Sequence, residues 1–165
     1  MLSHDHRLAT LIAATLVLAT AGTVAGARPA AAAANVYYVD SVNGDDARDG
    51  ASPDRAWRTL SRANAAGLAP GDKLLLARGS RFSDRLVVGA DGTPDAPIVI
   101  SAYGATGNTP VIESVDTGGH CVTLDGSYLT MTYLDIHNCA GSGGGVLIRG
   151  DAVVVSHNIV SDNTT

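Results

Sequence analysis

Large aromatic and charged side chains are scarce in this sequence of 165 residues. It contains one Phe, one Trp and five Tyr, and charged residues make up 16% of the chain. These numbers exclude a core built on large aromatic side chains. Small and β-branched residues must do the packing instead, which suits thin, repeated layers. Glycine, by contrast, is abundant, with 19 residues.

Basic residues are also few. Lys73 is the only lysine, the net charge is −5, and no run of basic residues occurs. Because nucleic-acid phosphates are bound by basic stripes, we predict that nucleic acid is not a partner. The acidic balance fits a soluble extracellular protein but does not identify a ligand.

The first 34 residues have the pattern of a secretory signal peptide. Arg7 supplies a positive charge, residues 8–24 form an apolar stretch, and residues 30–34 offer small side chains for cleavage near Ala34. A membrane anchor is the alternative, although the apolar stretch is at the short end for a span. We therefore predict a secreted, extracellular protein that has no membrane association after signal cleavage.

Two cysteines, Cys121 and Cys139, would meet an oxidising environment after export. A disulfide between them is one interpretation, and two small buried thiols are the other. Their spacing does not match a metal site, because there is no Cys-x-x-Cys and no second pair. The sequence leaves their redox state open.

Short apolar segments bounded by Gly, Pro and Asn predict a series of strands. The segments are residues 35–40, 73–79, 97–104 and 111–112. Residues 57–64 predict a short amphipathic helix, because Trp57, Leu60 and Ala63 fall on one face at helical spacing. Ser52-Pro53 provides a start for this helix.

A repeat of 24 residues follows. Segments 122–138 and 146–162 align without a gap, so that Gly126 matches Gly150 and the apolar positions coincide. We place Ile98 and Ile100 one further shift upstream of Val122 and Leu124. A fixed period in the twenties with alternating apolar positions indicates a solenoid, in which stacked turns bury what one turn cannot. The same shift places Arg149 beside Asp125 as an exposed pair of little energetic value.

Four segments resemble the right-handed parallel β-helix, or pectate-lyase-like, proteins of secreted bacterial origin. They are residues 37–45 (YYVDSVNGD), 49–60 (DGASPDRAWRTL), 70–79 (PGDKLLLARG) and 96–104 (APIVISAYG). The resemblance covers essentially all of residues 36–163. It implies an all-β parallel β-helix solenoid over residues 35–165, with a short capping helix in an N-terminal cap (35–69) and the first turns over 70–165.

Such proteins are usually much longer, with roughly ten turns and a terminal cap. Here the sequence stops directly after a repeat strand, so an apolar layer would be left open. We therefore expect a truncated or partial product. The alternative is that an oligomer partner stacks on the open end.

The loop after the first strand is the candidate metal site. Asp40, Asn43, Asp45 and Asp49 are hard oxygen donors close in sequence, which suits calcium. The spacing is not that of an EF-hand. The alternative is a loop whose Asx side chains cap turns.

Three histidines near the repeat are candidate bases, since imidazole titrates near neutral pH. His120 precedes the first repeat, and His137 and His157 lie beside outward turn positions. None has a visible carboxylate partner in the sequence, and a surface or turn role is the alternative. Asparagines at 138, 158 and 163 are expected to bond to neighbouring backbone groups.

The resemblance implies a carbohydrate function, because the family includes lyases, hydrolases and epimerases, along with adhesins. The leading hypothesis is the N-terminal part of a secreted protein active on extracellular polysaccharide, most simply a uronate lyase, with the fragment itself inactive. The catalytic residues are unknown. A non-enzymatic glycan-binding or surface module and a remnant of a decayed gene are the alternatives.

Overall fold

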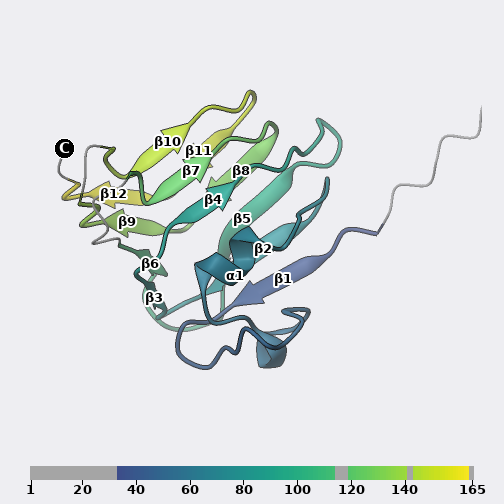
Figure 1. Ribbon diagram of the computed structural model, residues 1–165, viewed down its shortest axis with the longest axis vertical. Helices are drawn as coiled ribbons and strands as arrows, with labels where there is room; N and C mark the ends of the chain where they lie inside the picture. Colours follow the sequence, from purple (N-terminus) through teal and green to yellow (C-terminus); the bar gives the residue numbers. More distant parts are fainter. Residues whose placement is uncertain (1–32, 114–118, 141–142, 164–165) are drawn as a thin grey trace, which may run out of the picture. The chain divides into compact units, whose positions relative to one another are not determined.

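The computed structural model describes residues 33–113, 119–140 and 143–163, which belong to one compact unit (Figure 1). The predicted signal peptide falls, except for its last two residues, outside the described residues, so cleavage and export stay predictions. No helix in the described part of the chain is long and apolar enough to cross a membrane.

Three parallel sheets form the walls of the molecule, which is a right-handed parallel β-helix as predicted (Figure 1). The five-stranded sheet has the order β1 (Val36–Val39), β2 (Lys73–Ala77), β5 (Ile98–Tyr103), β8 (Leu129–Thr132) and β11 (Val154–Ser156). The three-stranded sheet consists of β4 (Leu86–Val88), β7 (Val122–Leu124) and β10 (Val146–Ile148). The four-stranded sheet consists of β3 (Arg81–Phe82), β6 (Val111–Ile112), β9 (Asp135–His137) and β12 (Ile159–Ser161).

The 24-residue repeat is one coil of the helix. Val122 pairs with Val146, Met131 pairs with Val155, and Ile136 pairs with Val160, one pair in each sheet. The register predicted by the repeat is therefore confirmed in all three sheets.

The upstream extension of the repeat was wrong. Val122 pairs with Leu86, whereas Ile98 pairs with Leu129 of the next sheet. The physical reason is loop length: residues 89–97 join β4 to β5, whereas residues 125–128 make the corresponding connection in the next coil. Extra residues at the corners are tolerated because they lie outside the core, but they break the sequence period.

Alternate residues of each strand point into the core. In the five-stranded sheet, Leu74, Leu76, Ile100 and Met131 are 0–1% exposed. The side chains between them face outward, as the period of two requires. Aliphatic side chains make up most of the core. The single Trp and the single Phe of the chain, Trp57 and Phe82, are also buried in it.

Two glycines allow the coils to approach closely at one corner. A Cβ atom on Gly126 would collide with the backbone carbonyl of Ala90 in the coil before it. A Cβ atom on Gly150 would collide with the carbonyl of Gly126 in the same way. The two glycines that match in the sequence repeat therefore lie one above the other, where the backbones of successive coils are in direct contact.

Non-glycine residues take the left-handed backbone conformation at three corners of each of the last two described coils. The pairs are Tyr128 and Ala152, Tyr133 and His157, and Asn138 and Asp162, with φ between 52° and 58°. Asn158 also supports a corner, since its side chain accepts from the Leu134 amide and donates to the Met131 carbonyl. Asn163 does the same with Cys139 and Ile136, so the role expected of these two asparagines is confirmed.

The N-terminal cap differs from the helix predicted over residues 57–64. A 3-10 turn, η1 (Pro53–Arg55), follows Ser52, and the helix α1 spans Leu60–Asn64. Trp57 lies outside the helix, where it forms a parallel bridge with Val39. The helix begins late because Thr59 is extended (φ −115°) and its side chain accepts from the Arg62 amide as the N-cap.

Trp57 nevertheless closes the end of the core. Its ring is 2% exposed and stacks on Tyr37 with 5.0 Å between centroids. The indole Nε1 donates to the Arg48 carbonyl at 2.9 Å, and the Arg62 guanidinium lies 4.4 Å from the ring centroid. These contacts anchor the cap loop to the first coil.

A disulfide joins Cys121 to Cys139, with Cα atoms 5.7 Å apart. It links the start of β7 to the corner after β9, so it closes one coil on itself. Of the two interpretations that the sequence left open, the structure has the bonded pair.

The last described coil exposes apolar side chains. Val154, Ile159 and Val160 are 52–53% exposed, and the neighbouring Val155 is 37% exposed. The predicted outward pair beside them is present, with Arg149 Nε 2.7 Å from Asp125 Oδ1. Covering of this layer, whether by more of the chain or by a partner, stays a prediction.

Substitution of Gly126 by Ala should destabilise the protein. The new methyl group must displace the Ala90 backbone, and overpacking of this kind costs about 2–3 kcal/mol. Urea unfolding followed by circular dichroism measures the change. Gly89→Ala is the matched control, because a Cβ atom there meets nothing within 4 Å. Equal unfolding midpoints for the two variants would contradict the close stacking of the coils.

Candidate functional site

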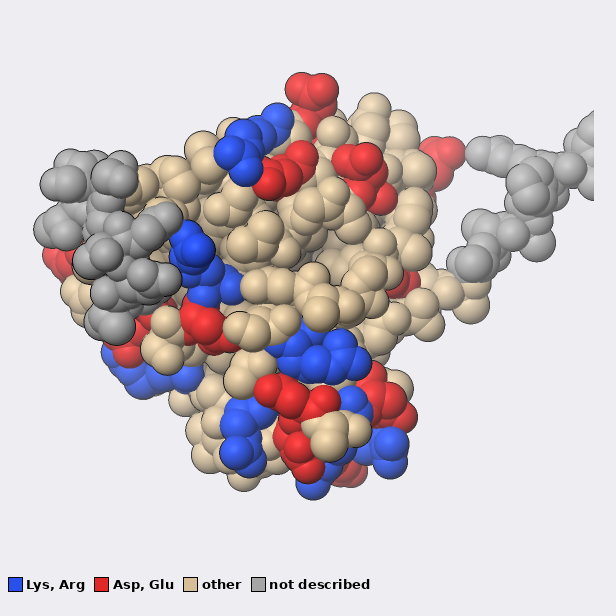
Figure 2. Space-filling model, in the orientation of Figure 1, with Lys and Arg blue, Asp and Glu red and all other residues tan. Residues whose placement is uncertain are grey.

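The residues of the predicted calcium site lie in the loop that follows β1. Asp40 Oδ1 accepts from the amides of Val42 and Asn43 at 2.8 and 3.0 Å, and Asp49 is bonded to the Arg55 guanidinium at 2.8 Å. Asp45 accepts from the Ala47 amide. Figure 2 shows acidic and basic side chains gathered in the lower part of the view, where this loop lies. The acids thus act as turn caps and ion-pair partners.

No group of three or more His, Cys, Asp or Glu side chains suited to a metal ion occurs within the described ranges. Asn43 is tied to Asp40, since its Nδ2 donates to Asp40 Oδ2 at 3.1 Å. Burial alone would raise the pKa of Asp40, but hydrogen bonds from Asn43, Val42 and Ser80 outweigh it and hold the pKa below its ordinary value. Calcium binding by this loop stays a prediction.

Asp46, which the sequence analysis did not single out, holds the start of the helix. Its Oδ1 accepts from the amides of Arg58 and Thr59 at 2.7 and 3.0 Å, and its Oδ2 accepts from the Thr59 hydroxyl at 2.8 Å. Burial raises the pKa of Asp46, but the bonds from Thr59 and Arg58 exceed this effect and lower the pKa below 3.8. The carboxylate therefore fixes the loop to the residue that caps α1.

The stabilisation by Asp46 should disappear in acid. Because the folded-state pKa lies below the unfolded value, the contribution is full above pH 3.8 and is lost as the pH falls through the lowered pKa. We expect Asp46→Asn to be less stable than the parent at pH 7 and the gap to narrow at pH 2, as measured by urea unfolding. Asp54→Asn, at an exposed position of the same loop, is the control. A gap that does not depend on pH would contradict this role.

A second polar cluster lies on the outer face of the four-stranded sheet and comes from three successive coils. Arg81 of β3 binds Glu113, which follows β6, through Nε–Oε1 at 3.1 Å and Nη2–Oε2 at 2.6 Å. His137 of β9 has its Nε2 3.8 Å from Glu113 Oε2 and its Nδ1 2.8 Å from Asp135 Oδ1. We call these four residues the β3/β6/β9 cluster.

The β3/β6/β9 cluster is partly sheltered. The side chains of Glu113, Asp135 and His137 are 19–25% exposed, and that of Arg81 is 57% exposed. Two carboxylates contact one imidazole. Most glycosidases use a pair of carboxyl groups to donate and accept protons, and imidazole does this work in many other enzymes. Among the described residues, it is the best candidate for chemistry on a sugar.

The sequence analysis found no carboxylate partner for His137, and the structure corrects this. Asp135 is two residues away on the same strand, so alternation places both side chains on one face. That signal was available in the sequence. Glu113 was harder to find, because it lies in the coil before the regular repeat begins.

The other two candidate histidines, and the single lysine of the chain, are placed apart from this cluster. His157 is exposed, its ring 5.3 Å from that of Tyr133. His120 Nδ1 is buried and has no hydrogen-bond partner among the described residues. Lys73 is exposed at the start of β2. None of the three is bonded to a carboxylate in the described part of the chain.

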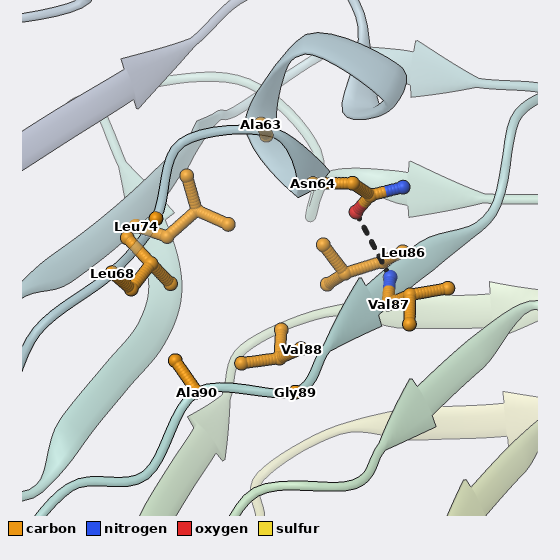
Figure 3. A pocket seen from close by; sticks show the side chains of 10 residues that line it. Ala63, Asn64, Leu68, Leu74, Leu86, Val87, Val88, Gly89 and Ala90 are labelled. Atoms are coloured by element: carbon orange, nitrogen blue, oxygen red, sulfur yellow. Dashed lines mark hydrogen bonds between the residues drawn. The ribbon is translucent and has the colours of Figure 1, made fainter.

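A hollow of about 230 Å³ lies between α1 and β4 (Figure 3). Leu68, Leu74 and Val88 line it with apolar surface. At its rim, Asn64 Oδ1 accepts from the Val87 amide at 2.9 Å, and Asn64 Nδ2 donates to the Arg85 carbonyl. The Asn64 amide thus pairs with the edge of β4 as another strand would.

Known proteins with similar sequences act on carbohydrates. A lacto-N-biosidase from Bifidobacterium longum subsp. longum is 40% identical over 129 residues, which is 62% of this chain and 8% of that protein. An alpha-1,3-galactosidase A from Akkermansia muciniphila is 30% identical over 73 residues, which is 44% of this chain and 12% of that protein. The chain therefore spans about a tenth of the length of these relatives. No family model matches it.

A solved structure with a similar fold is also that of a carbohydrate-active enzyme. The crystal structure of a GH136 lacto-N-biosidase from Eubacterium ramulus superposes with a TM-score of 0.61 at 28% identity, covering 78% of this chain and 28% of that chain. The fold is thus a β-helix of the kind found in carbohydrate-active proteins, as the resemblance in the sequence predicted.

Proposed function

We propose that this chain is part of a secreted protein that hydrolyses an uncharged extracellular glycan. The observation that carries the proposal is the 40% identity to a lacto-N-biosidase over 129 residues. A second relative is named as a galactosidase, and both names describe hydrolysis of neutral sugars. Because the chain spans a small part of each relative, the proposal concerns the whole protein to which this chain belongs.

The described residues supply two parts of such a protein. The cap, with Trp57 and α1, closes one end of the core and lets successive coils stack. The β3/β6/β9 cluster supplies carboxylates and an imidazole on an outer face. Export through the N-terminal signal belongs to the proposal, and the Cys121–Cys139 disulfide supports it, since disulfides persist in oxidising compartments.

A non-enzymatic glycan-binding module is the second candidate. It is favoured by the way the β3/β6/β9 cluster satisfies itself, since Arg81 bonds Glu113 and Asp135 bonds His137. Such an arrangement braces three coils without any ligand. The uronate-lyase hypothesis has weaker support, because neither of the two proteins with similar sequences is named as a lyase.

The native protein, purified from the culture medium of the producing cells, should begin just after Ala34 and release a disaccharide from lacto-N-tetraose. Mass spectrometry of the protein and chromatography of the sugars measure both results. Polygalacturonate should give no rise in ultraviolet absorbance, since hydrolysis forms no unsaturated sugar. A rise with polygalacturonate and no disaccharide release would reverse the assignment in favour of the lyase.

Glu113→Gln and Asp135→Asn in the same protein test the cluster. If either acid donates or accepts the proton, the rate should fall about a hundredfold or more. Asp151→Asn, at an exposed acid outside the cluster, is the control. Full activity in both cluster variants would show that these residues brace the coils and that the chemistry lies elsewhere.

A further inference from the structure

The outer face of the five-stranded sheet carries a row of uncharged side chains, one from each strand. Register pairs Tyr38 with Leu75 and Leu75 with Ser101, and then Thr132 with Ser156. Ser101 and Thr132 bridge the two halves, with their hydroxyl oxygens 3.0 Å apart. All five are intermediate in exposure, so solvent reaches them. The row runs along the axis of the solenoid.

Aromatic rings follow the edge of this row. Because the strands are parallel, their carboxyl ends lie along one side of the sheet. Tyr103 at the end of β5 meets Tyr38 of β1 edge to face, with 5.0 Å between centroids. Tyr133 follows β8, and His157 follows β11, with 5.3 Å between their rings. Tyr133 is 47% exposed, so a ligand can stack on its ring.

The hydroxyls at this edge are donors over the whole physiological range. Burial, with smaller contributions from Asp40, Tyr38 and Asp54, raises the pKa of Tyr103 to about 12. The phenol is therefore neutral at the pH of any extracellular fluid. Ser101, Thr132 and Ser156 are neutral donors and acceptors by their chemistry. The hydroxyls of Ser101, Thr132 and Ser156 lie on three adjacent strands beside aromatic rings, so this part of the face offers hydrogen bonds and stacking at the same time.

We infer that this face binds an uncharged oligosaccharide laid along the solenoid axis, with one sugar above each coil and one ring stacked on Tyr133. The inference rests on the proposed function for the class of ligand, a neutral glycan. It adds a location and an orientation that the proposed function does not contain.

The rise of the solenoid fits this ligand. Successive coils are about 4.8 Å apart, as strands in a sheet are. That rise is close to the length of one pyranose unit in an extended chain, so successive sugars can lie above successive coils. Sugar rings present C–H groups on one face and hydroxyls around the edge, which matches rings beside a hydroxyl row.

The lack of charge on this face favours an uncharged glycan over a polyuronate. A polyuronate carries one carboxylate on each sugar and would need a cation above each coil. The row itself is uncharged, and on the parallel row of described outward residues (Val36, Lys73, Val99, Thr130 and Val154) only Lys73 is charged. The acids that influence Tyr103 would repel a carboxylate. An uncharged glycan therefore fits where a polyuronate does not.

Titration calorimetry of the full protein with lacto-N-tetraose and cellotetraose tests the inference. We expect at least one to bind, and Tyr133→Ala to weaken its binding by about five- to tenfold, the effect of losing one ring contact. Tyr133→Phe should retain binding. Tyr128→Ala is the matched control, because Tyr128 precedes the same strand, is 37% exposed and shares the left-handed conformation, with φ 53° against 58°. Unfolding midpoints of the variants confirm that each is folded.

Three results would overturn the inference. They are binding of neither sugar, equal effects of Tyr133→Ala and Tyr128→Ala, and tighter binding of tetragalacturonate than of the neutral sugars. The proposed function fails separately. Disaccharide release with no effect of Tyr133→Ala on binding would refute sugar binding at this face, while the proposed hydrolase function would stand. Binding that depends on Tyr133, with no release of sugar, would support sugar binding at this face and refute the hydrolase, so that the protein would be a glycan-binding module.

Discussion

Backbone contact between successive coils is the constraint on which the rest of this structure depends. At one corner Ala90, Gly126 and Gly150 lie directly above one another, and no Cβ atom fits between Gly126 and the carbonyl below it. That contact and the alternation of apolar side chains favour the same register in all three sheets, because a slip of one residue would turn every inward side chain outward. The aliphatic core follows from the register, since no single coil is large enough to bury Leu74, Ile100 or Met131 by itself.

A stack of coils needs an end, and this chain closes its first end largely with side chains. Asn64 satisfies both the amide of Val87 and the carbonyl of Arg85, so the exposed edge of β4 is bonded to a side chain instead of to a strand. Asp46 fixes the loop to the capped start of α1, and Trp57 covers the core. The described edge at the other side has no equivalent, and apolar side chains of β11 and β12 are half exposed there.

Much of this fold could be predicted from the sequence, and the parts that could not have a common cause. The repeat between residues 122 and 162 predicted all three registers, because a coil without insertions preserves its period. The same reasoning failed for Ile98, where longer connections shift the phase. The helix was predicted to begin too early because apolar spacing does not reveal where Thr59 and Asp46 set the cap. The left-handed conformation at Tyr133 and Ala152 could not be predicted from the sequence, since neither residue type favours it.

Functional surfaces of a solenoid are hard to recognise in a sequence for a related reason. Residues that meet on an outer face are one coil apart, as Glu113 and His137 are, so no compact motif marks them. The search for metal ligands instead found the acids of one loop, where Asp40 and Asp49 are occupied as turn caps and ion-pair partners. Surfaces assembled across coils are also continuous in one direction, along the axis. A polymer with a repeat close to the coil rise is therefore the ligand that such a surface fits best, whereas a compact ligand would use only one or two coils. The uncharged row from Tyr38 to Ser156 has this form, and its lack of charge favours neutral sugars over uronates.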